Sequence, residues 1–193
     1  MWNDENLINI LKKGGITVMP TDTLYGMVGQ AQNPAVVERI YAMRKRSPDK
    51  PCIVLIGKIG ELEKFSIILS AEQKSKIKEY WAISAIADIA QYNPTSVILD
   101  CPDEKFAYLH RGTKTLAFRL PSPRLLRDLL LKVGPLIAPS ANPEGLAPAQ
   151  NISEAKKYFG NSVDLYLDGG KIIGQASKVI KLHKDGSVTI LRE

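Results

Sequence analysis

Short apolar runs alternate with amphipathic stretches along the whole chain. The first amphipathic stretch predicts a helix, which Asn3 or Asp4 caps and Gly14-Gly15 ends. Short apolar runs typical of strands follow at residues 16–19, 52–56, 95–99, 115–119, 136–138, 163–167, 178–182 and 188–191. Helical patterns lie between them, at residues 33–41, 59–65, 70–81, 82–92, 123–132 and 153–159. Because helices and strands are interspersed, the pattern predicts one α/β domain over residues 1–193, built on a mixed, twisted sheet.

The composition narrows the kind of protein. The 193 residues are 45% hydrophobic, which is enough to bury a sizeable core. No apolar run approaches the roughly 18 to 20 residues that a membrane span needs. The first residues also lack a secretion signal, so we expect a cytoplasmic protein with no membrane partner. Cys52 and Cys101 are far apart in sequence and only two histidines are present, so the sequence predicts neither a disulfide framework nor a metal site.

The charge favours a polyanionic partner. The net charge is +6 and the isoelectric point is about 9.2, values that suit nucleotides or RNA. The usual nucleotide signatures are absent, because the sequence holds no G-x-x-x-x-G-K-[ST] and no G-x-G-x-x-G after a strand. An ATP site in this chain must therefore be built from other residues.

Polar segments follow several of the predicted strands. The segment at residues 20–26, PTDTLYG, places two hydroxyls and a carboxylate after a buried strand. Ser140 and Asn142 follow another strand and could both face one ligand, and Asp168-Gly169-Gly170 follows a third. From the spacing alone, each segment can equally be a turn whose side chains bond their own backbone.

A basic segment lies between residues 39 and 50, with five basic side chains and one acidic one. Arg44 and Arg46 are two positions apart, and nearby prolines disfavour a helix through them. In an extended chain, both guanidinium groups point to the same side, where they could bind a polyphosphate. The alternative is a solvated basic turn.

The order and spacing of these segments resemble the YrdC-like domain of threonylcarbamoyl-AMP synthases. The matching elements are PTDTLYG at 20–26, RKRSPDKP at 44–51, TLAFRLP at 115–121, APSAN at 138–142, VDLYLDGG at 163–170 and ILR at 190–192. The resemblance spans nearly the whole chain and implies the short, single-domain form. It implies the YrdC-like fold, an open, strongly twisted α/β sheet flanked by helices, with a concave, positively charged surface.

The resemblance also implies an enzymatic activity. L-threonine, bicarbonate and ATP would give threonylcarbamoyl-AMP and pyrophosphate, for N6-threonylcarbamoyladenosine synthesis at position 37 of tRNA. ATP is then a substrate with Mg²⁺ on its phosphates, and the expected partners are tRNA or double-stranded RNA and the proteins that transfer the threonylcarbamoyl group to tRNA. The alternative is a non-catalytic RNA-binding paralogue, in which Phe106, Tyr108 and Phe118 stack on RNA beside Arg111 and Lys114.

Residue roles follow from the resemblance by position. The residues expected to contact L-threonine are Thr23, Arg119 and Ser177. Those expected to contact ATP are Arg46, Lys50, Thr115, Asn142 and Arg192. Those expected to be catalytic are Arg44, Arg46, Ser140 and Asn142, with Arg44 in place of the family's usual Lys.

Other positions also depart from the family pattern. Leu55 stands where some members have a threonine-contacting His, Lys178 interrupts a Ser-Thr-Val element, and residues 93–96 keep only part of a W-P-G-P-x-T element. If Leu55 and Lys178 face the amino-acid pocket, we expect weak selectivity for threonine over serine, or slow turnover. The alternative is that Lys178 points away from the pocket, because neighbours on a strand alternate between its faces.

Overall fold

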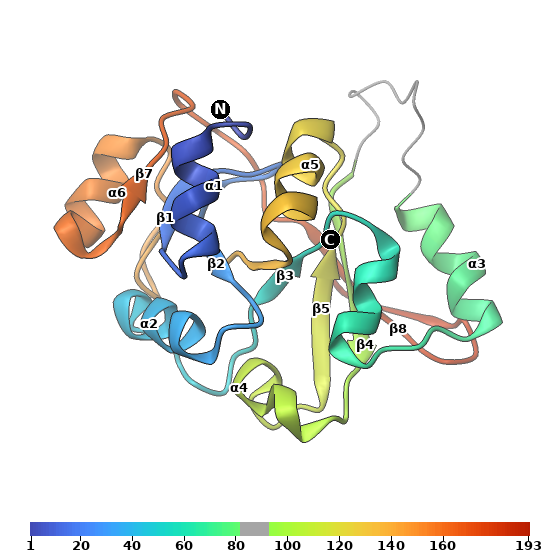
Figure 1. Cartoon of the computed structure of the whole chain (residues 1–193). Helices are drawn as coiled ribbons and strands as arrows, with labels where there is room; N and C mark the ends of the chain where they lie inside the picture. Colours follow the sequence, from blue (N-terminus) through green and yellow to red (C-terminus); the bar gives the residue numbers. More distant parts are fainter. Residues whose placement is uncertain (82–92) are drawn as a thin grey trace.

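The computed structural model describes residues 1–81 and 93–193, which form a large sheet covered by helices (Figure 1). The α-helices are α1 (Glu5–Lys12), α2 (Pro34–Arg44), α3 (Ala71–Tyr80), α4 (Ala107–His110), α5 (Arg124–Val133) and α6 (Ile152–Phe159). The 3₁₀ helices are η1 (Ile59–Phe65), η3 (Glu104–Phe106) and η4 (Gly160–Ser162). The strands are β1 (Thr17–Pro20), β2 (Tyr25–Gln30), β3 (Ile53–Leu55), β4 (Thr95–Asp100), β5 (Thr115–Arg119), β6 (Leu136–Ile137), β7 (Leu165–Tyr166), β8 (Lys178–Leu182) and β9 (Val188–Arg192). No helix in the described ranges is long and apolar enough to cross a membrane.

Strand pairing is mixed. In the described part of the chain, the strands join in the order β7-β1-β2-β6-β3-β5-β4-β8-β9. The pairs β1–β7, β3–β5 and β4–β8 are parallel, whereas β4–β5 and β8–β9 are antiparallel. Strands β7 and β9 are the two edges, so the sheet is open. This arrangement confirms the predicted mixed, twisted sheet flanked by helices.

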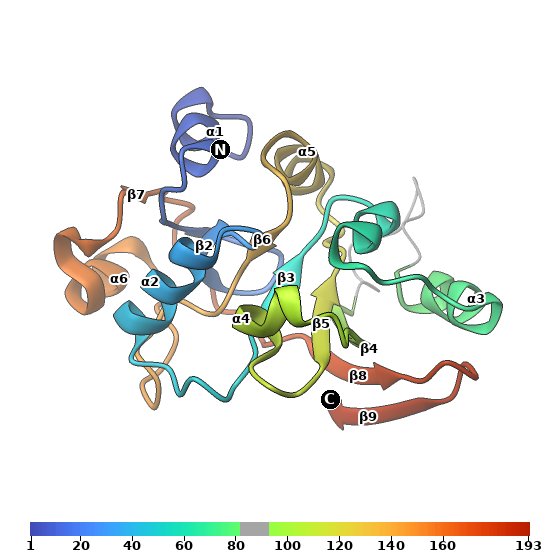
Figure 2. The same cartoon turned by 60° about the horizontal axis from the view of Figure 1, so that its bottom comes forward.

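The two faces of the sheet carry separate apolar cores, because neighbouring side chains on a strand point to opposite faces. On β1, Val18 belongs to the larger cluster and Met19 to the smaller one; on β3, Val54 and Leu55 divide in the same way. The smaller cluster lies under α1 and α5, which run side by side over one face (Figures 1 and 2). The larger cluster includes residues of α2, η1 and α3.

Local signals in the sequence explain where helices begin. Asp4 caps α1, because its Oδ1 accepts a hydrogen bond from the Leu7 amide at 2.9 Å. Ser70 begins α3 with a capping box, in which Gln73 bonds back to the Ser70 amide. These are the caps that the sequence predicts.

Strand β2 was not predicted, since its sequence, YGMVGQ, lies in what the pattern presents as a polar loop. Strand β2 contains two glycines, Gly26 and Gly29, and Gly29 is required by packing rather than by a turn. A Cβ at Gly29 would lie 2.4 Å from Val36 of α2, so the glycine lets this helix approach the strand closely. The predicted helix at 59–65 is a 3₁₀ helix, and the helix predicted at 82–92 lies outside the described residues.

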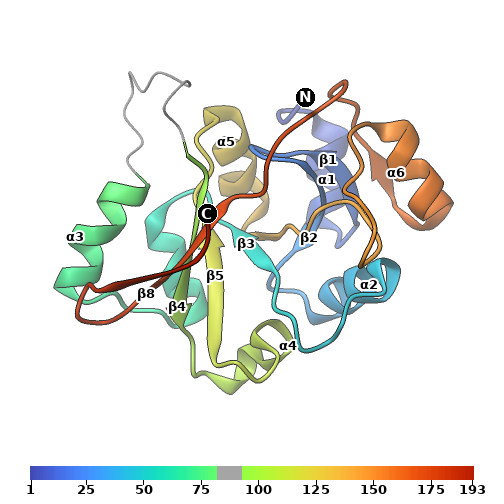
Figure 3. The same cartoon turned by 180° about the vertical axis from the view of Figure 1, so that it is seen from behind.

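The segment between β7 and β8 crosses one side of the molecule without regular secondary structure (Figure 3). It passes close to the loop between β1 and β2 at two glycines. A Cβ at Gly169 would lie 2.3 Å from a Pro20 side-chain carbon, and one at Gly174 would lie 2.0 Å from the Thr23 carbonyl oxygen. Both loops therefore depend on glycine for their close approach.

We expect Gly174→Ala to lower the free energy of unfolding by about 1–3 kcal/mol, because the added methyl group overlaps a backbone atom that has little freedom to move. Urea denaturation measures the change. Gly60→Ala is the matched control, since no atom lies within 4 Å of a Cβ there. Equal stability of the two variants would contradict the close packing of the segment against Thr23.

Candidate functional site

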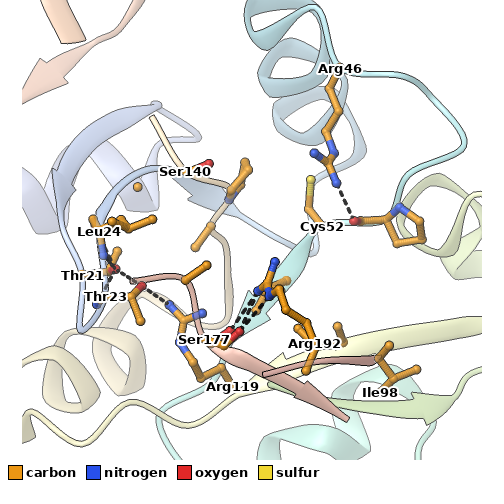
Figure 4. A pocket seen from close by; sticks show the side chains of 18 of the residues that line it. Thr21, Thr23, Leu24, Arg46, Cys52, Ile98, Arg119, Ser140, Ser177 and Arg192 are labelled. Carbon is orange, nitrogen blue, oxygen red and sulfur yellow. Dashed lines mark hydrogen bonds between the residues drawn. The ribbon is translucent and has the colours of Figure 1, made fainter. Parts of the chain in front are cut away.

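A cavity of about 410 Å³ opens over the sheet face formed by β3, β5, β4 and β8. The loop after β1, the segment after α2 and the end of β9 complete its wall (Figure 4). Most of the predicted site residues line it: Thr23, Arg44, Arg46, Thr115, Arg119, Ser140, Ser177 and Arg192. Lys50 and Asn142 are not among the lining residues. The fold thus brings eight of the ten predicted residues together from distant parts of the sequence.

Strand alternation on β5 explains which side chains face the cavity. Thr115, Ala117 and Arg119 line the cavity, whereas Leu116 and Phe118 between them belong to the larger core. The strand therefore presents two polar side chains to a ligand while its apolar ones hold the sheet to the helices on the other face.

A buried ion pair joins the end of β5 to the loop after β1. The Nε and Nη2 atoms of Arg119 donate to the Asp22 carboxylate at 2.9–3.2 Å, and the two side chains are only 4% and 1% exposed. Arg119 Nη2 also donates to Thr23 Oγ1 at 3.3 Å. The pair fixes both the cation and a hydroxyl at one end of the cavity.

The Thr21 side chain closes the turn of the same loop. Thr21 Oγ1 donates to the Leu24 carbonyl at 2.7 Å, and it lies 3.2 Å from Thr23 Oγ1. The two alternatives for this segment, a self-bonded turn and a loop at a site, are therefore compatible. It is a turn that bonds its own backbone, and it also lines the cavity.

A second polar group sits where β4, β8 and β9 meet. Ser177 Oγ lies 2.8 Å from Ser96 Oγ, and both serines are buried. Arg192 donates to the Ser177 carbonyl through Nε at 3.0 Å and Nη2 at 2.8 Å. Burial, and then repulsion from Arg119, lower the Arg192 pKa below its ordinary value.

Arg44 and Arg46 do not lie in an extended chain, so that prediction is wrong. Arg44 is the last residue of α2, and Lys45 then takes the left-handed conformation at φ 50°. The helix continues to this point because both prolines come later, at 48 and 51, where they no longer oppose it. Both residues nevertheless line the cavity, one from a helix end and the other from a loop.

Arg44 is almost fully buried, at 2% exposure, and is bound to the APSAN segment. Its Nε donates to the Asn142 carbonyl at 2.8 Å, and its Nη2 donates to Asn142 Oδ1 and Ser140 Oγ at 3.2 and 3.4 Å. Its Nη1 is buried without a hydrogen-bond partner in the described structure. Burial lowers the Arg44 pKa to about 10, so the group remains a cation at neutral pH with one donor still to satisfy.

Arg46 and Lys50 are engaged by their own loop. Arg46 donates to the Lys50 carbonyl at 2.9 Å and to the Pro51 carbonyl at 3.0 Å, and Tyr41 Oη also donates to the Lys50 carbonyl. The Lys50 ammonium group lies 2.5 Å from a carboxylate oxygen of Glu144. Lys50 is thus held at the edge of the site. In sequence it lies between Arg46 and Pro51, which both line the cavity.

Asn142 uses its side chain inside the protein. Its Oδ1 accepts from Arg44 and from Ser140 Oγ, and its Nδ2 donates to the Pro143 and Leu146 carbonyls at 2.9 and 2.7 Å. Of the two residues expected to face one ligand, only Ser140 lines the cavity, since Asn142 is buried and both ends of its amide are bonded within the fold.

The departures at Leu55 and Lys178 fall outside the cavity lining. Leu55 is fully buried in the smaller core, beneath α5. Lys178 lies between Ser177 and Val179, both of which line the cavity, and alternation turns it to the opposite face. The condition for weak threonine selectivity, that these two residues face the pocket, is therefore not met.

The aromatic residues of the RNA-binding alternative are mostly internal. Phe106 and Phe118 are buried at 4% and 0% exposure, and each packs against Phe65. Tyr108 Oη donates to the Ala31 carbonyl. The structure therefore contradicts stacking of bases on the rings of Phe106 and Phe118.

Sequence reasoning gave no role to several residues that shape the site. Asp22 lies between two threonines in the PTDTLYG motif, and this position could have marked it as a partner for Arg119. The apolar wall, made by Cys52, Ile98 and Val179, carries no signal that separates it from a core. Burial raises the Cys52 pKa, so this thiol stays protonated and is a wall residue rather than a nucleophile.

The electrostatic character of the site follows from these groups. Four arginines line the cavity, Arg44, Arg46, Arg119 and Arg192, and Asp22 neutralises one of them. Such a site suits a ligand with several negative charges. Across residues 1–81 and 93–193, no group of three or more His, Cys, Asp and Glu could hold a metal ion.

Comparison with known proteins agrees with the fold and the motifs. The model of the Sua5/YciO/YrdC family, described as telomere recombination, matches residues 9–193. The chain belongs to this family. A threonylcarbamoyl-AMP synthase of Hahella chejuensis is 28% identical over 195 residues, which cover 100% of this chain and 98% of the relative. One of Chromohalobacter salexigens is 31% identical over 162 residues, covering 82% and 80%.

Solved structures of the Sua5/YciO/YrdC family share the same fold. A variant of Pyrococcus abyssi Sua5 superposes with a TM-score of 0.80 at 25% identity, over 97% of this chain and 52% of that one. Escherichia coli YciO gives a TM-score of 0.78 at 23% identity, over 97% and 87%. The chain spans about half the length of the Sua5 chain and of the Bacillus subtilis synthase, of which it covers 49%. The predicted family and fold are confirmed.

We expect Asp22→Ala to lower the free energy of unfolding by about 3–5 kcal/mol, because it leaves the buried Arg119 guanidinium without its carboxylate. Chemical denaturation followed by circular dichroism measures the loss. Asp128→Ala is the control, since its ion pair with Arg124 is exposed and contributes at most about 0.5 kcal/mol. A loss at Asp22 as small as that at Asp128 would mean that the buried pair does not hold the site together.

Proposed function

We propose that this chain is an L-threonylcarbamoyladenylate synthase, which converts L-threonine, bicarbonate and ATP into threonylcarbamoyl-AMP and pyrophosphate. The observation that carries the proposal is the gathering of four arginines and the PTDT and APSAN hydroxyls around one cavity, in a chain whose full-length relatives are named as such synthases. The product would serve tRNA modification in the cytoplasm through proteins that transfer the threonylcarbamoyl group. Direct binding of tRNA or double-stranded RNA remains a separate expectation.

We assign different parts of the cavity to the two substrates. Thr23, Arg119 and Ser177 form the part that would bind threonine, with Arg119 held in place by Asp22. A Pyrococcus abyssi Sua5 structure of the same fold is described as complexed with L-threonine. Arg44 and Arg46 would lie toward the triphosphate.

Arg192 and Thr115, which both line the cavity, would contact ATP. Lys50 would join the phosphate contacts after leaving its present partner. Asn142 would act indirectly, because its hydrogen bonds hold Arg44 and Ser140 in place rather than reaching the ligand.

The reaction needs positioning and charge neutralisation more than a protein nucleophile. The threonine amine attacks the carbon of bicarbonate, and loss of water leaves a carbamate. A carbamate oxygen then attacks the α-phosphorus of ATP while the bond to the bridging oxygen breaks and pyrophosphate leaves. Arg44 Nη1, which is buried and unpartnered in the described structure, can donate to a phosphate oxygen as charge develops there.

Magnesium would arrive with ATP. Mg²⁺ retains several waters and usually binds through substrate phosphates. The residues that line the cavity include no carboxylate among those described, so phosphate and water oxygens would supply its ligands. The protein's contribution is the set of arginines around the remaining phosphate oxygens.

The decisive experiment measures pyrophosphate release from ATP by the purified chain. The proposal predicts release that depends on both threonine and bicarbonate, and threonylcarbamoyl-AMP in the product mixture by mass spectrometry. Serine supplied in place of threonine tests selectivity. Because Leu55 and Lys178 do not line the cavity, they give no reason to expect weak selectivity. ATP binding without any threonine-dependent release would overturn the proposal.

We expect Arg46→Ala to weaken ATP binding by about 1.5–3 kcal/mol, because a charge-assisted bond to a phosphate is lost. Calorimetric titration with ATP measures the effect. Thermal stability should change little, since the hydrogen bonds of Arg46 within the described structure go to two carbonyls of its own partly exposed loop. A large fall in melting temperature with unchanged ATP affinity would instead assign Arg46 a structural role.

A further inference from the structure

Glu144 joins two loops of the site, and its role is not explained by the fold alone. It follows the APSAN segment, and both of its carboxylate oxygens are bonded to the loop after α2. Oε1 accepts from Lys50 Nζ at 2.5 Å, and Oε2 accepts from the Ser47 amide. The Glu144 amide donates to the Arg44 carbonyl at 2.8 Å, which fixes the backbone of Glu144 at the helix end.

The two bonds of the Glu144 carboxylate differ in kind. The bond from the Ser47 amide orients the loop, and any acceptor at this position could accept it. The bond from Lys50 is an ion pair in which the lysine side chain is 56% exposed and the glutamate 28%. A pair this exposed is weak and exchanges readily. The loop can therefore keep its shape while Lys50 changes partner.

Lys50 lies next to the cavity but does not line it, whereas Arg46 and Pro51 on either side both do. The Lys50 carbonyl is fixed by bonds from Tyr41 Oη and Arg46 Nε. Only the side chain is left to move. A polyphosphate in the cavity carries several negative charges against the single charge of Glu144, so it would attract the ammonium group away.

We propose that Glu144 is a positioning residue that acts as an exchangeable latch: it holds Lys50 outside the cavity until a polyphosphate takes the ammonium group, while its bond to the Ser47 amide keeps the loop in place. The inference rests on the proposed function in taking ATP as the ligand. It adds that Glu144 competes with ATP for Lys50 and so reduces ATP affinity in the wild-type protein.

Glu144→Gln separates the two bonds, because glutamine still accepts from the Ser47 amide but no longer pairs with Lys50. We expect the dissociation constant for ATP to fall about two- to fivefold, the range that exposed ion pairs of this kind can supply. Glu144→Ala loses both bonds, so its ATP affinity should be lower than that of Glu144→Gln. Calorimetric titration with ATP and with inorganic tripolyphosphate gives these values without any need for turnover.

The same titrations in a Lys50→Met background complete a double-mutant cycle. We expect Glu144→Gln to have no effect there, since the competing ammonium group is gone. An equal gain with and without Lys50 would show plain repulsion between Glu144 and phosphate, and an unchanged or weaker affinity in the wild-type background would show a structural role; either result overturns the latch. Threonine-dependent pyrophosphate release by the wild-type chain, assayed separately, shows whether the proposed function itself stands.

Discussion

The buried ion pair between Asp22 and Arg119 is the constraint on which the site depends. Strands β1 and β5 are separated in the sheet by β2, β6 and β3, so neither strand could place a side chain against the other directly. The loop after β1 bridges this distance and is held by a carboxylate that is 1% exposed. Because a buried charge without a partner is strongly unfavourable, the pair forces the loop into one position and carries Thr23 to the cavity with it.

Much of the fold was predictable because strand alternation and helix caps are local signals. The eight strands read from apolar runs are present, and Asp4 and Ser70 cap the helices expected of them. Strand β2 was not predictable in this way, since Gly29 looks like a turn residue in sequence but serves the close approach of α2. A glycine that is required for the close approach of a neighbouring helix does not indicate the secondary structure in which it lies.

The site was predictable from motifs to the extent that motif residues line the cavity. Eight predicted residues line the cavity, yet the sequence could not show that Asn142 turns its amide inward, because a buried hydrogen-bond network depends on the partner's position in space. Leu55 shows the same limit from the other side. It pairs with Arg119 in the sheet, but α5 covers it, so its distance from the pocket is decided by a helix that starts about 70 residues later.

The four cavity arginines are held to different degrees, and this difference bears on how charge is managed before a ligand binds. Arg119 is neutralised by Asp22, whereas Arg46 and Arg192 donate to backbone carbonyls that carry only partial charge. Arg44 is the most deeply buried and keeps one donor without a partner in the described structure, and burial lowers its pKa to about 10. The free-energy cost of burying this cation is already present in the folded protein before a ligand binds. An anion in the cavity would relieve it, so Arg44 would contribute to binding through a penalty that already exists without the ligand.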